Sequence, residues 1–395
     1  MTPPKWLIYA ITATGILANP LIAPAIPDIL ADLDAPRGQA GFLIAAGTLP
    51  GIVVAPVIGV LADRYGRRAV LLPCLVLFGL FGVGASFAGS FWILLALRLG
   101  QGVGSAGLIN LAVVLVGDHW DGVERARILG QNSAVLTVSL AVLPPLGGFL
   151  TELGSWRLAF APYGLAIVTA AVLWRLLPET TANTGVTMRG QLREALGFAR
   201  TRAVMGTVGL GFVIFFLIFG LFLTVMPLLV EDRFGLGAGA RGLVLAVPAI
   251  TSTLAALSLG RLQLRFGRSR LILLGSILFT VSFAAIAGAP ALWLVLVAAL
   301  VYGFGEGMSI PTLQDVVAGA APASSRGAVV ALWVGGARAG QTAGPLAAGG
   351  AVTLLGEGGA FGAGAVVAGL LIVAQLALRR PERPPEREAP ARAAA

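Results

Sequence analysis

The sequence predicts an all-α membrane protein whose twelve transmembrane helices form two pseudo-symmetric six-helix halves. Hydrophobic residues make up 57% of the 395 positions and the mean hydropathy is +0.91, whereas soluble domains contain roughly 45 to 50% apolar residues. Apolar runs long enough to cross a bilayer recur along the whole chain, and one charged motif occurs twice at an offset of 201 residues. Composition, run length and repetition therefore indicate the same architecture.

Each predicted span is an apolar run close to the roughly 20 residues that a helix needs to cross the hydrocarbon core. The spans are 6–27, 38–61, 69–89, 91–117, 128–151, 156–177, 203–230, 236–259, 270–288, 291–318, 326–351 and 357–378. We expect an N-terminal half at 1–177 and a C-terminal half at 203–378. Residues 178–202 become basic and amphipathic, which predicts a cytoplasmic linker on the membrane surface. Residues 379–395 are rich in proline and charge, which predicts a disordered cytoplasmic tail.

The cationic residues indicate how the chain is oriented in the membrane. Arg98 and Arg338 lie inside predicted spans, and four arginines fall in loops on one side. These four are Arg37, Arg157, Arg233 and Arg241. The other 21 of the 27 Lys and Arg residues fall on the side of both termini. Because positive residues are retained on the cytoplasmic side, we expect a multi-pass protein of the plasma membrane with both termini in the cytoplasm.

The charged motif is GVLADRYGRR at 59–68, and its second copy is GRLQLRFGRSR at 260–270. The glycines and arginines repeat, but Leu264 stands where the first copy has Asp63. The second half therefore repeats the first in the same orientation. Transporter halves related in this way place a substrate site at their interface near the middle of the membrane.

These residues resemble the major facilitator superfamily, and the resemblance extends over essentially the whole chain. The first copy matches the pattern G-x-L-a-D-r-x-G-r-k that the family carries between its second and third helices. The matching residues are Gly59, Leu61, Ala62, Asp63, Arg64, Gly66, Arg67 and Arg68. A second pattern, R-x-x-q-G-x-g of proton-linked members, is matched in the fourth helix. Its residues are Arg98, Gln101, Gly102 and Gly104.

Two further segments are similar to the drug:proton antiporter branch of that family. The stretch NPLIAPAIPDIL at 19–30 resembles the signature of the first helix. In the fifth helix, Pro145, Gly147 and Gly148 match the antiporter pattern G-P-x-x-G-G, but Pro144 stands where the pattern has glycine.

The resemblance implies a cytoplasmic latch between the halves. Asp63 is expected to lie on the positive N-terminal end of the eleventh helix, near Ser325, with Arg125 able to pair with the same acid. Such a contact closes the cytoplasmic side and breaks when that side opens. The predicted latch residues are Gly59, Asp63, Arg64, Gly66, Arg67, Arg68 and Arg125. The alternative for the arginines is that they only anchor the hairpin at the lipid headgroups.

Four charged residues are predicted to take part in proton coupling. Glu306 is the only carboxylate deep in a predicted span, and Arg338 lies at a similar depth in the following span, so the two are expected to pair. A permanent structural ion pair is the alternative. Arg98 is expected to influence proton movement, or else to serve neighbouring carbonyls and Gln101 structurally. Asp28 takes the coupling role if Glu306 does not.

Polar residues within spans and phenylalanines of the seventh helix are predicted to line a substrate cavity. They are Asn19, Gln101, Asn110, Asn132, Phe215, Phe219 and Gln341. For each polar residue, a hydrogen bond between helices is the alternative. The phenylalanines favour an apolar cavity that tolerates many ligand shapes.

The sequence therefore predicts a transporter and not an enzyme. It is expected to export lipophilic or amphipathic small molecules in exchange for protons by alternating access, as a monomer. One histidine, His119, and one cysteine, Cys74, give no metal or redox site, and no cofactor is expected. The net charge is +9, but the basic residues are not interleaved with aromatic residues as they would be in a nucleic-acid-binding surface. The alternatives are a proton-linked uptake carrier for a small polar metabolite and a non-transporting membrane scaffold or receptor.

Overall fold

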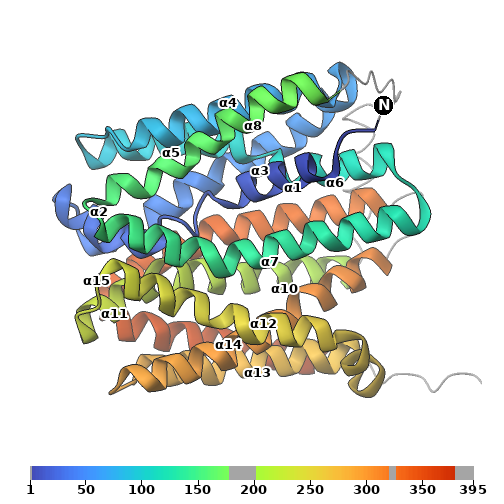
Figure 1. The fold of residues 1–395 in the computed structure, drawn as a ribbon. Helices are drawn as coiled ribbons and strands as arrows, with labels where there is room; N and C mark the ends of the chain where they lie inside the picture. Colours follow the sequence, from blue (N-terminus) through green and yellow to red (C-terminus); the bar gives the residue numbers. More distant parts are fainter. Residues whose placement is uncertain (1, 178–201, 320–325, 379–395) are drawn as a thin grey trace, which may run out of the picture.

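The computed structural model describes residues 2–177, 202–319 and 326–378, so almost all of the predicted linker and the whole predicted tail lie outside the described residues. Every regular element within those ranges is helical (Figure 1). Ten of the described helices are long and apolar enough to cross a membrane. The predicted fold class of an all-α membrane protein is confirmed.

The N-terminal half contains four continuous spans and two that are interrupted. Its elements are α1 (Lys5–Ile16), η1 (Ala23–Ala25), α2 (Ile26–Asp32), η2 (Arg37–Gln39), α3 (Ala40–Tyr65), α4 (Arg67–Ala85), α5 (Phe91–Ser105), α6 (Leu108–His119), α7 (Gly122–Glu152), η3 (Trp156–Gly164) and α8 (Leu165–Leu176). The first span is broken between α1 and α2, where Pro20 and Pro24 each remove a backbone donor, and Pro27 lies in the first turn of α2.

The C-terminal half has α10 (Arg202–Leu217), a π-helical stretch η4 (Ile218–Val225), α11 (Met226–Phe234), α12 (Ala238–Phe266), α13 (Arg268–Ala287), α14 (Leu292–Gly319) and α15 (Arg326–Leu378). The 53-residue α15 divides at Gly356, whose φ of 70° is not helical. The divided α15 and the interrupted first span are together consistent with twelve membrane crossings.

A single glycine forms the turn of each charged hairpin. Gly66 joins α3 to α4 with a φ of 92°, and Gly267 joins α12 to α13 with a φ of 76°. Residues with a Cβ rarely adopt such angles. The predicted spans ended too early here, because α3 continues through Asp63 to Tyr65. Gly59, the other glycine of the first motif, has no atom within 4 Å of a Cβ built there, so it makes no close helix contact in this structure.

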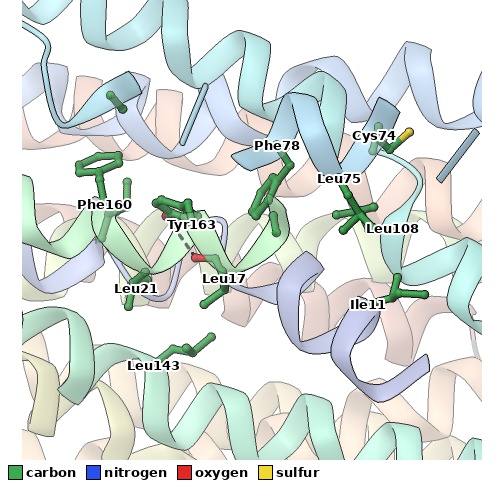
Figure 2. Packing of buried hydrophobic residues seen from close by; sticks show 14 of the residues in the cluster. Ile11, Leu17, Leu21, Cys74, Leu75, Phe78, Leu108, Leu143, Phe160 and Tyr163 are labelled. Atoms are coloured by element: carbon green, nitrogen blue, oxygen red, sulfur yellow. Dashed lines mark hydrogen bonds between the residues drawn. The ribbon is translucent and has the colours of Figure 1, made fainter. Parts of the chain in front are cut away.

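Each half buries its own apolar core. In Figure 1, α1, α4, α5 and α8 lie in the upper bundle and α12, α13 and α14 in the lower one. Figure 2 shows part of the upper core, where the rings of Phe78 and Tyr163 meet edge to face at 5.4 Å. The cores interlock at two points, because Leu228 packs with the N-terminal core and Ala23 with the C-terminal one. The halves are therefore separately packed bodies in contact.

The close approach of α5 to α4 generates a stability prediction. A Cβ atom at Gly104 would overlap the backbone nitrogen of Phe78, whereas nothing lies within 4 Å of a Cβ at the exposed Gly130 of α7. Overpacking costs typically about 1 to 3 kcal/mol, against a helix-propensity gain of about 1 kcal/mol for replacing glycine by alanine. We expect Gly104→Ala to lower the thermal unfolding temperature in detergent and Gly130→Ala to leave it equal or higher. Equal unfolding temperatures for the two variants would contradict this packing.

Candidate functional site

The helices run between two faces, which we name by what they carry. The hairpin face carries the α3–α4 and α12–α13 turns, and the opposite face carries α2, η2 and the start of α12. The distribution of cationic residues predicts that the hairpin face is cytoplasmic.

A cavity of about 410 Å³ lies between the two halves. Its C-terminal wall is aromatic and its N-terminal wall carries neutral polar groups. The aromatic residues are Phe215, Phe219, Phe222, Tyr302 and Trp333, and the polar ones include Asn19, Thr48, Ser105, Asn110 and Thr137. Of the predicted cavity residues, Asn19, Asn110, Phe215, Phe219 and Gln341 line this space. The π-helical stretch η4 contributes several of the lining side chains, and π-bulges are frequent at functional sites.

Two predicted cavity residues lie elsewhere. Gln101 is buried in the N-terminal half, where its Oε1 accepts a hydrogen bond from Arg98 Nη1 at 2.5 Å. Asn132 of α7 is buried outside the cavity lining, and its Oδ1 has no hydrogen-bond partner among the described residues. These two residues lie outside the lining because depth in a span does not specify which side of the helix a residue occupies.

Glu306 and Arg338 both line the cavity, but they do not form the expected ion pair. Arg338 Nη2 instead donates to the carbonyl oxygen of Ala106 in the N-terminal half at 3.1 Å. The reason is helix packing: α14 contacts mainly α12 and α13, whereas α15 contacts α10, α13 and α3. Two residues at one depth on consecutive helices therefore both face the cavity without pairing. Within the described ranges, Glu306 has no hydrogen-bond or ion-pair partner.

Arg98 is completely buried, and neutral acceptors surround its guanidinium. Its Nε donates to Leu43 O at 3.3 Å, Nη1 to Ala18 O at 2.8 Å and Nη2 to Asn19 Oδ1 at 2.5 Å. Tyr163 closes the network by donating to the same Ala18 carbonyl at 3.0 Å. Arg98 does not line the cavity, but Asn19 connects it to the cavity wall. A planar fork with several donors fits this set of separated acceptors.

The arginines at both hairpins clamp a neighbouring helix. Arg67 contacts Asp63 and donates through Nε to Asp118 at the end of α6 at 2.9 Å. In the second half, Arg268 Nε donates to Asp315 of α14 at 2.7 Å. Sequence reasoning missed both partner acids, although each is the carboxylate near the end of the fourth helix in its half. The hairpin arginines therefore do more than anchor the chain at lipid headgroups.

The remaining predicted latch residues surround this clamp. Arg64 stacks over the adjacent ring of Tyr65 at 5.4 Å, and Arg68 follows Arg67 as the second residue of α4. Arg125 lies against Gly117 of α6 and makes no ion pair with Asp63. The expected helix N-terminus near Ser325 lies outside the described residues.

On the opposite face, side chains from the two halves contact each other directly. Asp28 lies outside the cavity lining and forms an ion pair with Arg241 of the other half. Glu152 Oε1 accepts from the backbone nitrogen of Gly239 at 2.9 Å. Arg37 contacts three acids of the C-terminal half, namely Glu231, Asp232 and Glu357.

Glycines bring the backbones of the two halves together on the same face. A Cβ atom at Gly148 would overlap the carbonyl oxygen of Ala238, and one at Gly41 would overlap that of Pro345. Two antiporter-type residues of α7 take part in this packing, because Gly148 lies against Ala238 and Pro145 lies beside Gly242 of α12. The third, Gly147, meets the backbone of Leu21 within the N-terminal half.

Packing is looser toward the hairpin face. Nothing lies within 4 Å of a Cβ built at Gly59, Gly260 or Gly335. Asn110 and Gln314, which line the cavity on this side, are solvent-exposed. The cavity is therefore closed toward the opposite face and open toward the hairpin face.

Comparisons with known proteins agree with this architecture. The sequence profile of the Major Facilitator Superfamily matches residues 6–257 and 208–395. The bacillibactin exporter of Bacillus subtilis is 27% identical over 316 residues, covering 76% of this chain and 78% of the exporter. The class B tetracycline resistance protein of Escherichia coli is 28% identical over 351 residues, 86% of each chain. The structure of the nucleoside transporter NupG superposes with a TM-score of 0.75 at 14% identity, over 94% of this chain and 98% of NupG. The chain belongs to the major facilitator superfamily and is a membrane transporter.

Proposed function

We propose that this protein exports lipophilic or amphipathic small molecules in exchange for protons, by alternating access in the plasma membrane. The observation that carries the proposal is a carboxylate, Glu306, that has no bonded partner in the described structure and faces an aromatic cavity between the halves. The exporter relatives support the direction of transport. A monomer with the hairpin face in the cytoplasm is part of the same proposal.

The walls of the cavity support an amphipathic substrate. The rings of Phe222 and Tyr302 stack at 4.5 Å, and Phe215 meets Trp333 at 6.1 Å. These aromatic surfaces suit flat apolar groups, while the neutral polar wall of the N-terminal half suits hydroxyl, carbonyl or amide substituents. The volume of about 410 Å³ falls in the range of sites for drug-sized ligands.

Glu306 is suited to carry the proton because no ion pair has to break when it gains or loses one. Arg338 keeps its guanidinium on the Ala106 carbonyl across the interface, so it contributes positive charge to the cavity without neutralising the acid directly. Substrate entering from the hairpin face would change the surroundings of Glu306 and favour release of its proton to the cytoplasm. Return of a proton from the opposite side would complete the cycle. Arg98 supports this cycle by fixing Asn19 in the cavity wall.

The alternative of proton-linked uptake is favoured by the amides that line the same cavity, which include Asn110, Gln314 and Gln341. The fold is shared with a nucleoside transporter. Sidedness separates the two functions. Export predicts substrate accumulation in inverted vesicles driven by an acidic interior, whereas uptake predicts accumulation in right-side-out vesicles driven by acid outside.

Replacing Glu306 with glutamine tests the coupling role. We expect Glu306→Gln to abolish transport driven by a pH gradient while substrate binding in detergent persists, because glutamine resembles the protonated acid. The control is Glu124→Gln, which removes a partly exposed acid paired with Lys5 at the start of α7. Substrate-induced proton release from inverted vesicles is the measurement. Undiminished proton release in Glu306→Gln would refute the role of this residue.

The latch is tested at Asp63. We propose that Asp63 turns from its contact with Arg67 to the C-terminal half when the hairpin face closes. Asp63→Asn should then lower turnover by about tenfold, within the range of 5- to 150-fold that typical coupling energies produce. Asp315→Asn is the matched control because it weakens the Arg268 clamp in the half that lacks the latch acid. A turnover equal in the two folded variants would remove the latch from the mechanism.

A further inference from the structure

The opposite face is held closed by charged contacts that cross between the halves in both directions. Asp28 and Glu152 of the N-terminal half contact the first turn of α12 in the C-terminal half. Arg37 of the N-terminal half contacts acids of α11 and α15. Three C-terminal helices at this face, α11, α12 and α15, are thus tied to the other half.

We propose that Asp28 and Glu152 are positioning residues that hold the N-terminus of α12 and thereby set the equilibrium between inward-facing and outward-facing states. This inference rests on the alternating access and orientation of the proposed function, but it requires no particular substrate or coupling ion. We call the contacts of Asp28 and Glu152 with α12 the α12 lock.

The burial of Arg241 explains why its contact with Asp28 favours the state in which the opposite face is closed. Its side chain is only 3% exposed, and its ion-pair partner in the described structure is Asp28. Its Nε has no hydrogen-bond partner there. A buried cation that loses its partner without gaining water is strongly destabilised, so opening requires Arg241 to become hydrated as α12 moves away from Asp28.

Glu152 adds a second, independent contact at the same turn. Its carboxylate lies over Gly237 and Gly239, where a Cβ atom at either position would crowd it, and it accepts from the Gly239 nitrogen at 2.9 Å. An anion at a helix N-terminus is favoured by the helix dipole and by the unsatisfied backbone donors. Glycines at 237 and 239 therefore make room for the acid of the other half.

Arg37 forms a more exposed clasp beside the lock. Its nitrogens lie 2.6 Å from Glu231, 3.0 Å from Glu357 and 3.7 Å from Asp232. Its side chain is 41% exposed, and ion pairs in solvent contribute little individually. Asp28 is equally exposed at 41%, but its partner Arg241 is 3% exposed, and because of this buried cation the lock is expected to dominate over the clasp.

Cysteine accessibility tests the lock without substrate. The only native cysteine, Cys74, is buried and can be replaced by alanine. Leu245→Cys places a thiol on α12 one turn below Arg241, at a buried position that lines the cavity. Gln314→Cys places one at the exposed end of the cavity toward the hairpin face. A membrane-impermeant maleimide is applied to right-side-out and to inverted vesicles.

We expect Asp28→Asn combined with Glu152→Gln to raise labelling of Leu245→Cys in right-side-out vesicles by about fivefold or more. Labelling of Gln314→Cys in inverted vesicles should fall in parallel. The matched control is Asp32→Asn. Asp32 accepts hydrogen bonds from Arg157 and Trp156, which lower its pKa, but all three residues belong to the N-terminal half. This control should leave both labelling rates unchanged.

Unchanged labelling in the double variant, or an equal rise in the Asp32→Asn control, would overturn the proposal. If the double variant does not fold, the charge exchange Asp28→Arg with Arg241→Asp takes its place. It should show wild-type labelling, whereas Asp28→Arg alone should label faster, and equal labelling of these two also overturns the lock. Failure of the proposed orientation appears separately, as labelling of Gln314→Cys from the outside. Failure of proton coupling leaves the labelling pattern intact.

Discussion

The interface between two separately packed halves is the contact on which the rest of the structure depends. Each half buries its own core, so the interface does not have to supply the stability of the fold. The interface must instead pack tightly at one face while leaving the two halves able to separate there. Close backbone contacts at Gly41 and Gly148 provide the tight packing. Ionic contacts such as Asp28 with Arg241 suit an interface that opens, because both charges become hydrated when the halves part.

Charge inside the bundle is divided between a satisfied group and an unsatisfied one. Arg98 is fully buried and donates to several neutral oxygens of the N-terminal half. It has no need of a counter-ion from the other half, and its bonds can persist through a rearrangement of the interface. Glu306 faces the cavity without a bonded partner in the described structure. An expensive intramembrane charge that lacks a structural partner indicates a functional site.

Much of the fold could be predicted from the sequence because apolar run length and cationic asymmetry report directly on the bilayer. The side-chain contacts of the site were less accessible. Depth along a span placed Glu306 and Arg338 at one level, but it did not reveal that Arg338 bonds to Ala106 of the N-terminal half and leaves Glu306 unpaired in the described structure. The same limit applies to Gln101, which turns toward Arg98 and away from the cavity. The pairing of Asp28 with Arg241 joins residues 213 positions apart, and no periodicity in the sequence connects them.

The repeat also explains why the acid of the charged motif, Asp63, occurs in only one of its two copies. Both copies keep the arginine clamp, through Asp118 in the first half and Asp315 in the second. Each clamp joins helices within one half, so each half needs its own clamp. Asp63, by contrast, would serve a helix of the other half, as Glu152 serves the start of α12 on the opposite face. An acid at the position of Leu264, which is 92% exposed, would add a second latch at the face where the cavity opens. A single latch acid at the hairpin face would let that face release when α15 moves away.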